Sequence, residues 1–272
     1  MSNEITKSNA SGKMTFSAFI TSSGMKNKIN QIIGDEKTGN RFISSIISAV
    51  STNPALAECD NASIVSGALL GEALKLSPSP QLGLYYLVPF NLKGRGMVAQ
   101  FQLGYKGYIQ LAIRSGQYKK LNVIAIKEGE LIKYDPLNEE LEVKLIDDEL
   151  KREKAKTIGY YAMFEYTNGF RKSMYWSKEK MEKHALQYSR GYQAKKGSTF
   201  WERDFDAMAY KTMLRQLISK WGIMSIDLQN AYESDMAVIH EDGSKEYVDN
   251  ATIDEEVFEA AYEEPQTLDD IE

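Results

Sequence analysis

The sequence contains very little cysteine and histidine. Cys59 is the only cysteine among 272 residues, so the chain cannot form an intrachain disulfide, as is usual in a reducing cytoplasm. The two histidines, His184 and His240, lie far apart in the sequence, and with one cysteine they do not match the spacing of a zinc cluster. We therefore expect a cytoplasmic protein without a metal site of this kind.

Long apolar runs and a leader sequence are also missing. No stretch approaches the ~18 consecutive apolar residues that a membrane-spanning helix requires. The first residues, MSNEITKSNASGKM, are polar, unlike the apolar centre of a secretory signal peptide. We expect residues 1–20 to form a flexible N-terminal arm, and we expect no association with membranes.

Two motifs of enzyme chemistry are absent from the chain. The phosphate-binding pattern G-x-x-x-x-G-K-[ST] does not occur, which excludes the usual P-loop for ATP. The G-x-S-x-G turn that presents a nucleophilic serine is missing as well. His184 lies in a charged segment, where a surface or packing role is more common than catalysis. The sequence favours a protein without covalent chemistry and without ATP, and leaves Mg²⁺ open as a cofactor.

Negative charge is concentrated at the C-terminal end. Residues 233–272 hold 15 acidic residues and one lysine, whereas residues 1–232 hold 32 basic against 23 acidic residues, a net of +9. A basic body without a membrane segment most often binds a polyanion, and nucleic acid is the first candidate. We expect 233–272 to be an acidic tail that is a solvated spacer, a partner-binding segment, or a competitor for the basic surface.

Hydrophobic spacing predicts helices first, strands in the middle and helices again, which indicates an α+β fold with a small antiparallel or mixed sheet. We expect a single core domain over residues 21–232. Asn168-Gly169 favours a tight hairpin turn between two strands in 157–177, and Ser177 is suited to N-cap the helix that follows. The other expected helices are 40–51, 62–76, 104–116 and 200–221, and the other expected strands are 82–90, 97–103, 122–127 and 141–146.

Basic residues at helical spacing are the candidate DNA contacts. Lys106 and Arg114 share one face of the helix 104–116, and Lys211 and Arg215 follow an i+4 row with Arg203 on the helix 200–221. Cations at this spacing can follow a chain of phosphates. The predicted contacts are Lys93 and Arg95 at a hairpin tip, Lys106, Arg114, Lys119, Lys120, Lys211 and Arg215. Rings of the 157–177 hairpin can stack on bases, although only one strand parity faces outward.

Two other functions fit parts of the sequence. Asp135, Glu142 and Lys144 resemble the acid and lysine pattern of a Mg²⁺-dependent nuclease. In so charged a region, a solvated strand explains the same pattern. A structural oligomer whose basic surface contacts something other than DNA is a third possibility.

Two long segments carry a family resemblance. FQLGYKGYIQLAIRSGQY (101–118) and FWERDFDAMAYKTMLRQLISKWG (200–222) resemble the signature regions of the RecT family of phage and prophage recombinases. The resemblance implies a fold similar to the Red beta-type annealing proteins. It also implies an ATP-independent protein, not an enzyme, that anneals single-stranded DNA and holds the resulting duplex in a basic groove of a ring or helical filament. Expected partners of the tail are an exonuclease and the host single-strand-binding protein.

Overall fold

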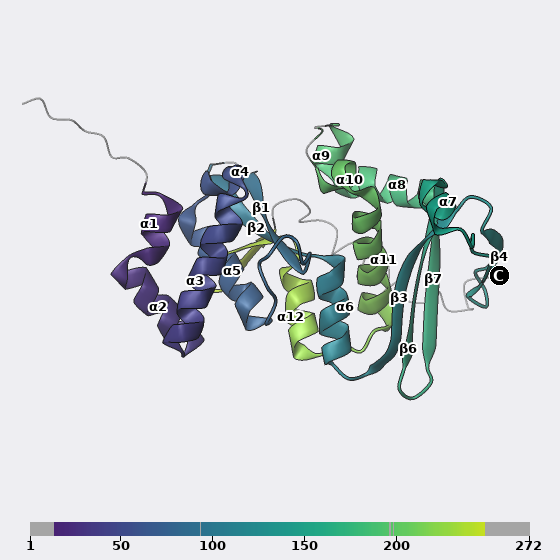
Figure 1. The fold of residues 1–272 in the computed structure, drawn as a ribbon, viewed down its shortest axis with the longest axis horizontal. Coiled ribbons are helices and arrows are strands. Elements are labelled where there is room, and N and C mark those ends of the chain that lie inside the picture. Colours follow the sequence, from purple (N-terminus) through teal and green to yellow (C-terminus); the bar gives the residue numbers. More distant parts are fainter. Residues whose placement is uncertain (1–13, 93, 196, 198, 248–272) are drawn as a thin grey trace, which may run out of the picture.

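Five helices at the start of the chain form a lobe around an apolar core (Figure 1). Asp35 and Asp60 accept hydrogen bonds from backbone amides where α3 and α5 begin. Phe42, Ile46 and Val50 of α3 are buried, which confirms the predicted helix over 40–51. The computed structural model describes residues 14–92, 94–195, 197 and 199–247. The lobe consists of α1 (Phe16–Thr21), α2 (Ser23–Ile33), α3 (Glu36–Ser51), α4 (Pro54–Ala57) and α5 (Asn61–Ala73).

A four-stranded antiparallel sheet packs against this helical lobe. The predicted hairpin forms β1 (Tyr85–Leu92) and β2 (Gly96–Leu103). The strands β8 (Ala237–Ile239) and β9 (Lys245–Tyr247) extend it in the order β1-β2-β8-β9. Pro89 lies on β1, at the edge of the sheet, where its missing N–H removes no ladder hydrogen bond.

The fold extends past both ends of the predicted 21–232 core. Phe16 and Ile20 are buried in the helical lobe, so part of the expected N-terminal arm is helix α1. At the other end β8 and β9 lie within the expected acidic tail, and Glu246 pairs with Arg95. The predicted boundary at residue 232 is therefore corrected, because β8 and β9 pair into the first sheet. Residues 1–13 and 248–272 lie outside the described residues.

A second sheet forms the other lobe. The strands β3 (Tyr118–Lys127), β6 (Thr157–Tyr166) and β7 (Arg171–Ser177) pair antiparallel in the order β3-β6-β7. The turn after β6 contains Gly169 at φ +88°, a conformation that glycine tolerates, and the predicted hairpin is confirmed. Ser177 accepts a hydrogen bond from the Lys180 amide and starts α8 (Lys178–Tyr188), as predicted.

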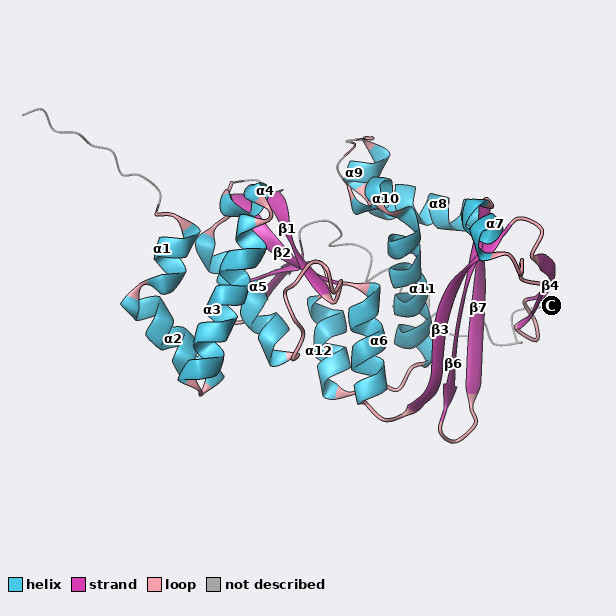
Figure 2. Ribbon diagram, viewed as in Figure 1, coloured by secondary structure: helices cyan, strands magenta, loops and turns pink. Residues whose placement is uncertain are grey.

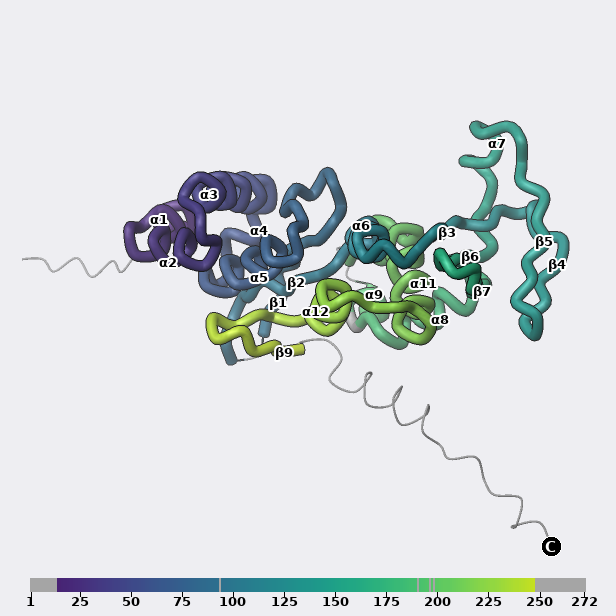
Figure 3. Tube along the Cα trace, turned by 90° about the horizontal axis from the view of Figure 1, so that it is seen from below, coloured from purple at the N-terminus to yellow at the C-terminus, as the bar shows by residue number. Residues whose placement is uncertain are grey.

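A small hairpin and a short helix project from this second lobe. The strands β4 (Leu131–Asp135) and β5 (Glu140–Val143) pair with each other, and α7 (Glu149–Lys154) follows. The view from below in Figure 3 shows this part at the end of the molecule opposite the helical lobe. Glu130 is fully buried and binds Arg152 at 2.6 Å, which fixes α7 to the end of β3.

Three helices fill the space between the lobes (Figure 2). They are α6 (Tyr105–Arg114), α11 (Phe205–Trp221) and α12 (Ile226–Ser234), and the short α9 (Arg190–Gln193) and α10 (Phe200–Arg203) precede α11. On α11, Leu214 and Ile218 belong to the core shared with α6, whereas Met213 and Leu217 face the β3-β6-β7 sheet. α11 therefore joins the two lobes into a single α+β domain, as expected.

The predicted helix 200–221 is divided into two helices. Asp204 adopts φ −147° and accepts a hydrogen bond from the Ala207 amide, so it ends α10 and caps α11. The i+4 row expected from Arg203 to Lys211 is therefore interrupted at Asp204, between the two helices. None of the helices in the described part of the chain is both long and apolar enough to span a membrane.

Candidate nucleic-acid interface

The two predicted cations of α6 lie in different surroundings. Lys106 is exposed on the first turn, and its ammonium lies 6.0 Å from the Tyr105 ring centre. Arg114, about 12 Å farther along the helix, donates a hydrogen bond of 2.6 Å to the Leu74 carbonyl. Arg114 thus ties α6 to the end of α5, although both residues are exposed.

Glycines beside Lys106 pack against the protein itself. A Cβ atom at Gly104 would lie 2.1 Å from the carbonyl oxygen of Gly83, and one at Gly107 would lie 2.2 Å from that of Leu84. The structure shows that these two glycines let α6 contact the segment before β1, which holds Lys106 in place.

Lys211 and Arg215 point into the protein and share one carboxylate. Lys211 is only 7% exposed, and its ammonium lies 2.8 Å from Asp235, while Arg215 approaches the other oxygen of Asp235 at 2.9 Å. Asp235 also accepts from the Leu103 amide and from the Tyr108 hydroxyl. The expected solvent-facing row is thus wrong at Lys211, because Asp235 draws this side chain inward.

Burial and charge act against each other in this network. Burial raises the pKa of Asp235, but Lys211, Arg215 and the hydrogen bonds outweigh that effect and hold it below its ordinary value. Arg215 remains partly exposed and stacks on Tyr232 at 4.2 Å. Of this pair, only Arg215 reaches the surface. No local sequence pattern indicated Asp235 as the partner of Lys211 and Arg215.

The remaining predicted contacts lie on separate parts of the surface. Lys119 and Lys120 both contact Glu165 of β6, at 2.6 and 3.6 Å. Arg95 binds Glu246 of β9 at 3.0 Å, at the hairpin tip in the first lobe. Lys93 lies outside the described residues. The structure therefore does not bring the predicted cations together into one cluster.

A group of cations and rings lies on β7, α8 and α11, and sequence reasoning had identified only Arg215 and the Trp176 ring among its members. The Lys172 ammonium sits over the Trp221 ring at 3.6 Å, and the Lys180 ammonium over the Trp176 ring at 4.3 Å. Trp221 is 51% exposed. Glu139 also contacts Lys172. We call this group, with its neighbours, the α8–α11 surface; its residues are Lys172, Trp176, Lys180, His184, Arg215, Lys220 and Trp221.

The electrostatic environment of the α8–α11 surface is positive. Burial, Arg215 and Lys180 together lower the pKa of His184 to about 4, so its ring is neutral near pH 7. Burial and the charge of Lys220 likewise lower the pKa of Lys180. The charged neighbours that cause these shifts are all cations. The positive potential that disfavours an added proton on these side chains favours the binding of an anion such as phosphate.

Sequence periodicity contained part of this signal. Lys172 and Trp176 share one parity of β7, and Trp176, Lys180 and His184 follow at intervals of four across the strand–helix junction. We had considered the Trp176 ring for base stacking but not the lysines beside it. The position of Trp221 over Lys172 depends on the packing of α11 against β7, which no local pattern reveals.

Parity also sorts the aromatic rings of the hairpin. Tyr160, Phe164 and Tyr166 are buried against α8 and α11. Tyr161 and Tyr175 pair across the strands on the opposite face of the sheet. Parity thus separates these rings as expected, except that Trp176, which pairs with Tyr160 on the inner face, is only half-buried.

The nuclease pattern is not arranged as a metal site in the described residues. Asp135 accepts hydrogen bonds from the Leu137 amide and from the amide groups of Asn138, so it caps the β4–β5 turn. Glu142 pairs in register with Lys133 on the neighbouring strand. Over the described ranges, no group of three Asp, Glu, His or Cys side chains could hold a metal ion.

Comparisons with known proteins agree with the two signature segments. A family model described as "RecT family" matches residues 40–250. The chain is 40% identical to "Uncharacterized protein YqaK" of Bacillus subtilis (strain 168) over 258 residues, 95% of this chain and 82% of that protein. It is 29% identical to "Protein RecT" of Escherichia coli (strain K12) over 221 residues, 80% of this chain and 79% of that protein. This chain belongs to the RecT family.

Proposed function

We propose that this protein anneals complementary single strands of DNA during recombination, without ATP and without covalent chemistry. Family membership supports DNA binding and strand annealing in recombination. Within the protein, the α8–α11 surface is the observation that carries the proposal. It combines cations, which bind phosphates of any sequence, with rings that stack on any base.

The annealing step follows from electrostatics. Two complementary strands repel each other through their phosphates, and cations that neutralise one backbone lower this repulsion. Contacts to phosphates carry no sequence information, so base pairing alone selects the partner strand. Duplex formation is favourable by itself, and the protein therefore needs no nucleotide hydrolysis.

Assembly and partners complete the proposal. When copies of the chain assemble into a ring or filament, the weak contacts of each subunit with one strand together give strong binding. A basic groove shared along such an assembly fits this role. The acidic tail, limited by the structure of β8 and β9 to the residues after Tyr247, is proposed to bind an exonuclease or a single-strand-binding protein. Mg²⁺ dependence is left to the assay.

Annealing of two labelled oligonucleotides tests the function. At low salt and without any triphosphate, the protein should accelerate duplex formation between complementary strands and leave mismatched strands apart. If it does not accelerate pairing, the proposed function is wrong. If the labelled strands become shorter when Mg²⁺ is added, the alternative Mg²⁺-dependent nuclease with Asp135, Glu142 and Lys144 is favoured instead.

A charge-removing double variant tests the surface. In Lys180→Ala/Lys220→Ala, the loss of two phosphate contacts should reduce the slope of log affinity against log salt by about 1.4, at about 0.7 per contact on single strands. Lys183→Ala is the matched control, since Lys183 lies on the same helix, is exposed, and pairs with Glu179. An unchanged slope in the double variant would remove these lysines from the DNA contacts.

A further inference from the structure

The β3-β6-β7 sheet has a second face that the proposed binding surface does not use. On β6, Tyr160 and Phe164 point toward α8 and α11, so strand alternation directs Tyr161, Met163 and Glu165 to the other side. We call this side the outer face. Its residues belong to all three strands of the sheet. The β4–β5 hairpin covers the middle of this face, where Met163 and Ser173 are 9% and 6% exposed and the Ser173 hydroxyl donates to the Glu139 carbonyl.

A row of charge crosses the outer face near one end of the sheet. The strand register places Lys120 opposite Glu165, and Glu165 opposite Arg171. Lys119 and Lys120 are 57% and 64% exposed, whereas Glu165, which both ammonium groups contact, is 17% exposed. One carboxylate thus holds two lysines in place, and with Arg171 the row retains a net charge of +2.

Aromatic rings lie beside this charged row. The Arg171 guanidinium donates a hydrogen bond of 3.3 Å to the Tyr161 hydroxyl. Tyr161 pairs in register with Tyr175, whose ring lies 5.1 Å from that of Tyr134 on β4. Cations next to partly exposed rings repeat the composition of the α8–α11 surface on the opposite face of the same sheet.

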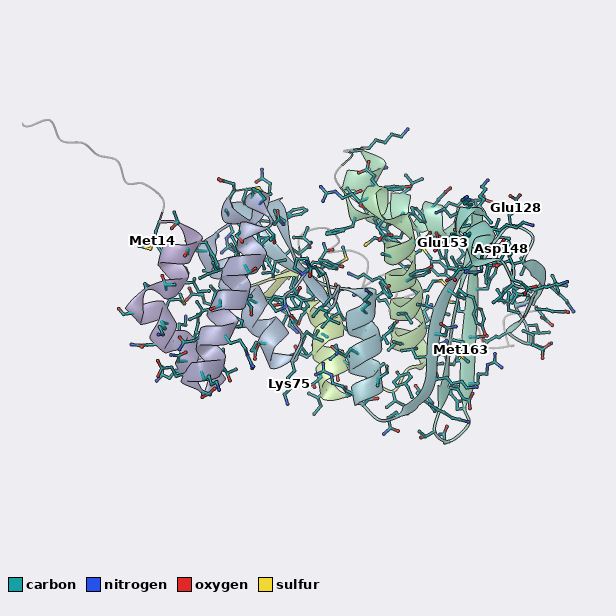
Figure 4. The ribbon with its side chains drawn as sticks, in the orientation of Figure 1. Met14, Lys75, Glu128, Asp148, Glu153 and Met163 are labelled. Carbon is teal, nitrogen blue, oxygen red and sulfur yellow. The ribbon has the colours of Figure 1, made fainter. Side chains whose placement is uncertain are left out.

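Acidic residues limit how far a polyanion can extend along the outer face. Glu128, Asp148 and Glu153 gather at the far end of β3, as the labelled side chains in Figure 4 show. Lys120 precedes Glu128 by eight residues, about 26 Å along an extended strand. Carboxylates of the β4–β5 hairpin line a cavity of about 510 Å³ beside Arg171, together with Lys133. The cationic region is therefore the end of the sheet around Lys119 and Lys120.

We propose that the outer face is a second binding site for single-stranded DNA, separate from the α8–α11 surface. The inference rests on the proposed function and adds a place for a further strand. The two sites lie on opposite faces of one sheet, so a strand on one does not block the other. The outer-face row has three cations and the α8–α11 surface has four. Glu165 contacts the first set and Glu139 the second, in which Arg215 also shares Asp235 with the buried Lys211. The outer face is therefore the weaker of the two sites. A weakly held strand close to a tightly held one has a raised local concentration and still exchanges quickly.

A two-step binding experiment tests the second site. The protein is first given one equivalent of a fluorescent oligo-dT strand, which occupies the tighter site, and binding of a second oligo-dT strand with another label is then titrated. Because the strands are not complementary, base pairing does not contribute. In the wild type we expect a second, weaker and salt-sensitive binding step. A protein that carries one strand and binds no second strand overturns the inference and leaves the proposed function intact.

Variants assign that second step to the outer face. Lys119→Ala/Lys120→Ala should lower the salt slope of the second step by about 1.4 and leave the first step unchanged. Glu165→Gln should strengthen the second step, a gain that damage to the fold would not produce. Lys26→Ala/Lys28→Ala on α2 is the matched control, because it also removes two lysines that contact carboxylates and whose side chains are 39% and 48% exposed.

Other outcomes are equally decisive. If Lys119→Ala/Lys120→Ala weakens both steps equally, the outer face is part of the first site and the inference fails. If this variant changes only the second step while Lys180→Ala/Lys220→Ala changes only the first, both assignments stand. If neither double variant changes any step, the α8–α11 assignment fails together with the inference.

Discussion

Replacing Asp235 by alanine should lower the free energy of unfolding more than removing one partner of a surface ion pair does. The carboxylate accepts hydrogen bonds from the Leu103 amide, the Tyr108 hydroxyl, Lys211 and Arg215, and without it Lys211 becomes a buried ammonium without its anion. Removing one partner of a buried pair costs about 3–5 kcal/mol. Total stabilities are about 5–15 kcal/mol, so this is a large share.

Thermal and urea unfolding followed by circular dichroism measure the effect. At about 2–4 °C per kcal/mol for a chain of this size, Asp235→Ala should lower the melting temperature by roughly 6–20 °C. Asp242→Ala is the control, because Asp242 is exposed and only caps a turn through Ser244. A melting temperature within a few degrees of the wild type for Asp235→Ala would refute the reasoning.

A double-mutant cycle separates the ion pair from general damage. Lys211→Met removes the charge that Asp235→Ala would leave buried, so the double variant should be more stable than the sum of the single effects by about 0.5–3 kcal/mol. Strict additivity in the cycle would mean that the two groups do not interact.

The pKa of Asp235 is held below its ordinary value of 3.8. The stability that its ionised carboxylate contributes is therefore present above that pH and is lost as the pH falls further.

Two further predictions concern pH and packing. The pKa of His184 is lowered to about 4 from an ordinary 6.5. Its neutral form is thus favoured in the fold, so up to about 3 kcal/mol of stability should be lost as the pH falls from 6.5 to 4. His184→Gln should flatten the stability profile in that window, and an unaltered profile would contradict the assignment. Gly107→Ala should destabilise the fold because its Cβ meets the Leu84 carbonyl, whereas Gly24→Ala on α2, with nothing within 4 Å, should stabilise by up to about 1 kcal/mol; equal signs in urea unfolding would contradict the packing argument.

Local features explain which elements were predictable. The Asn168-Gly169 turn, the Ser177 cap and the apolar spacing of α3 act over a few residues, and the structure has each of them where the sequence indicated. Asp204 is also a local signal, since aspartate commonly caps helices. We overlooked this cap because the apolar pattern continues on both sides of Asp204. For the same reason we wrongly expected one row of cations to continue from Arg203 across Asp204 to Lys211.

Long-range pairs explain what the sequence did not reveal. Lys211 is buried because Asp235, 24 residues later, draws it inward. The strands β8 and β9 have three residues each and stand among acidic residues, so composition indicated a tail rather than a sheet edge. The Lys172–Trp221 contact likewise joins residues that only the packing of α11 brings together. In each case the deciding partner lies outside any window of periodicity.

The lysine–tryptophan pairs offer a physical reason why binding can be firm and still allow strands to pair. A lysine over an exposed ring gains about 0.5–1 kcal/mol, whereas a nucleobase stacked on a ring is worth about 1–3 kcal/mol. For the proposed annealing function we therefore infer that a base displaces the ammonium of Lys180 from Trp176 and that this ammonium then binds the phosphate of the same nucleotide. Stacking uses the face of the base and leaves its pairing edge open. Once a duplex forms, its bases stack on each other and no longer on the ring, so this part of the affinity falls when annealing is complete.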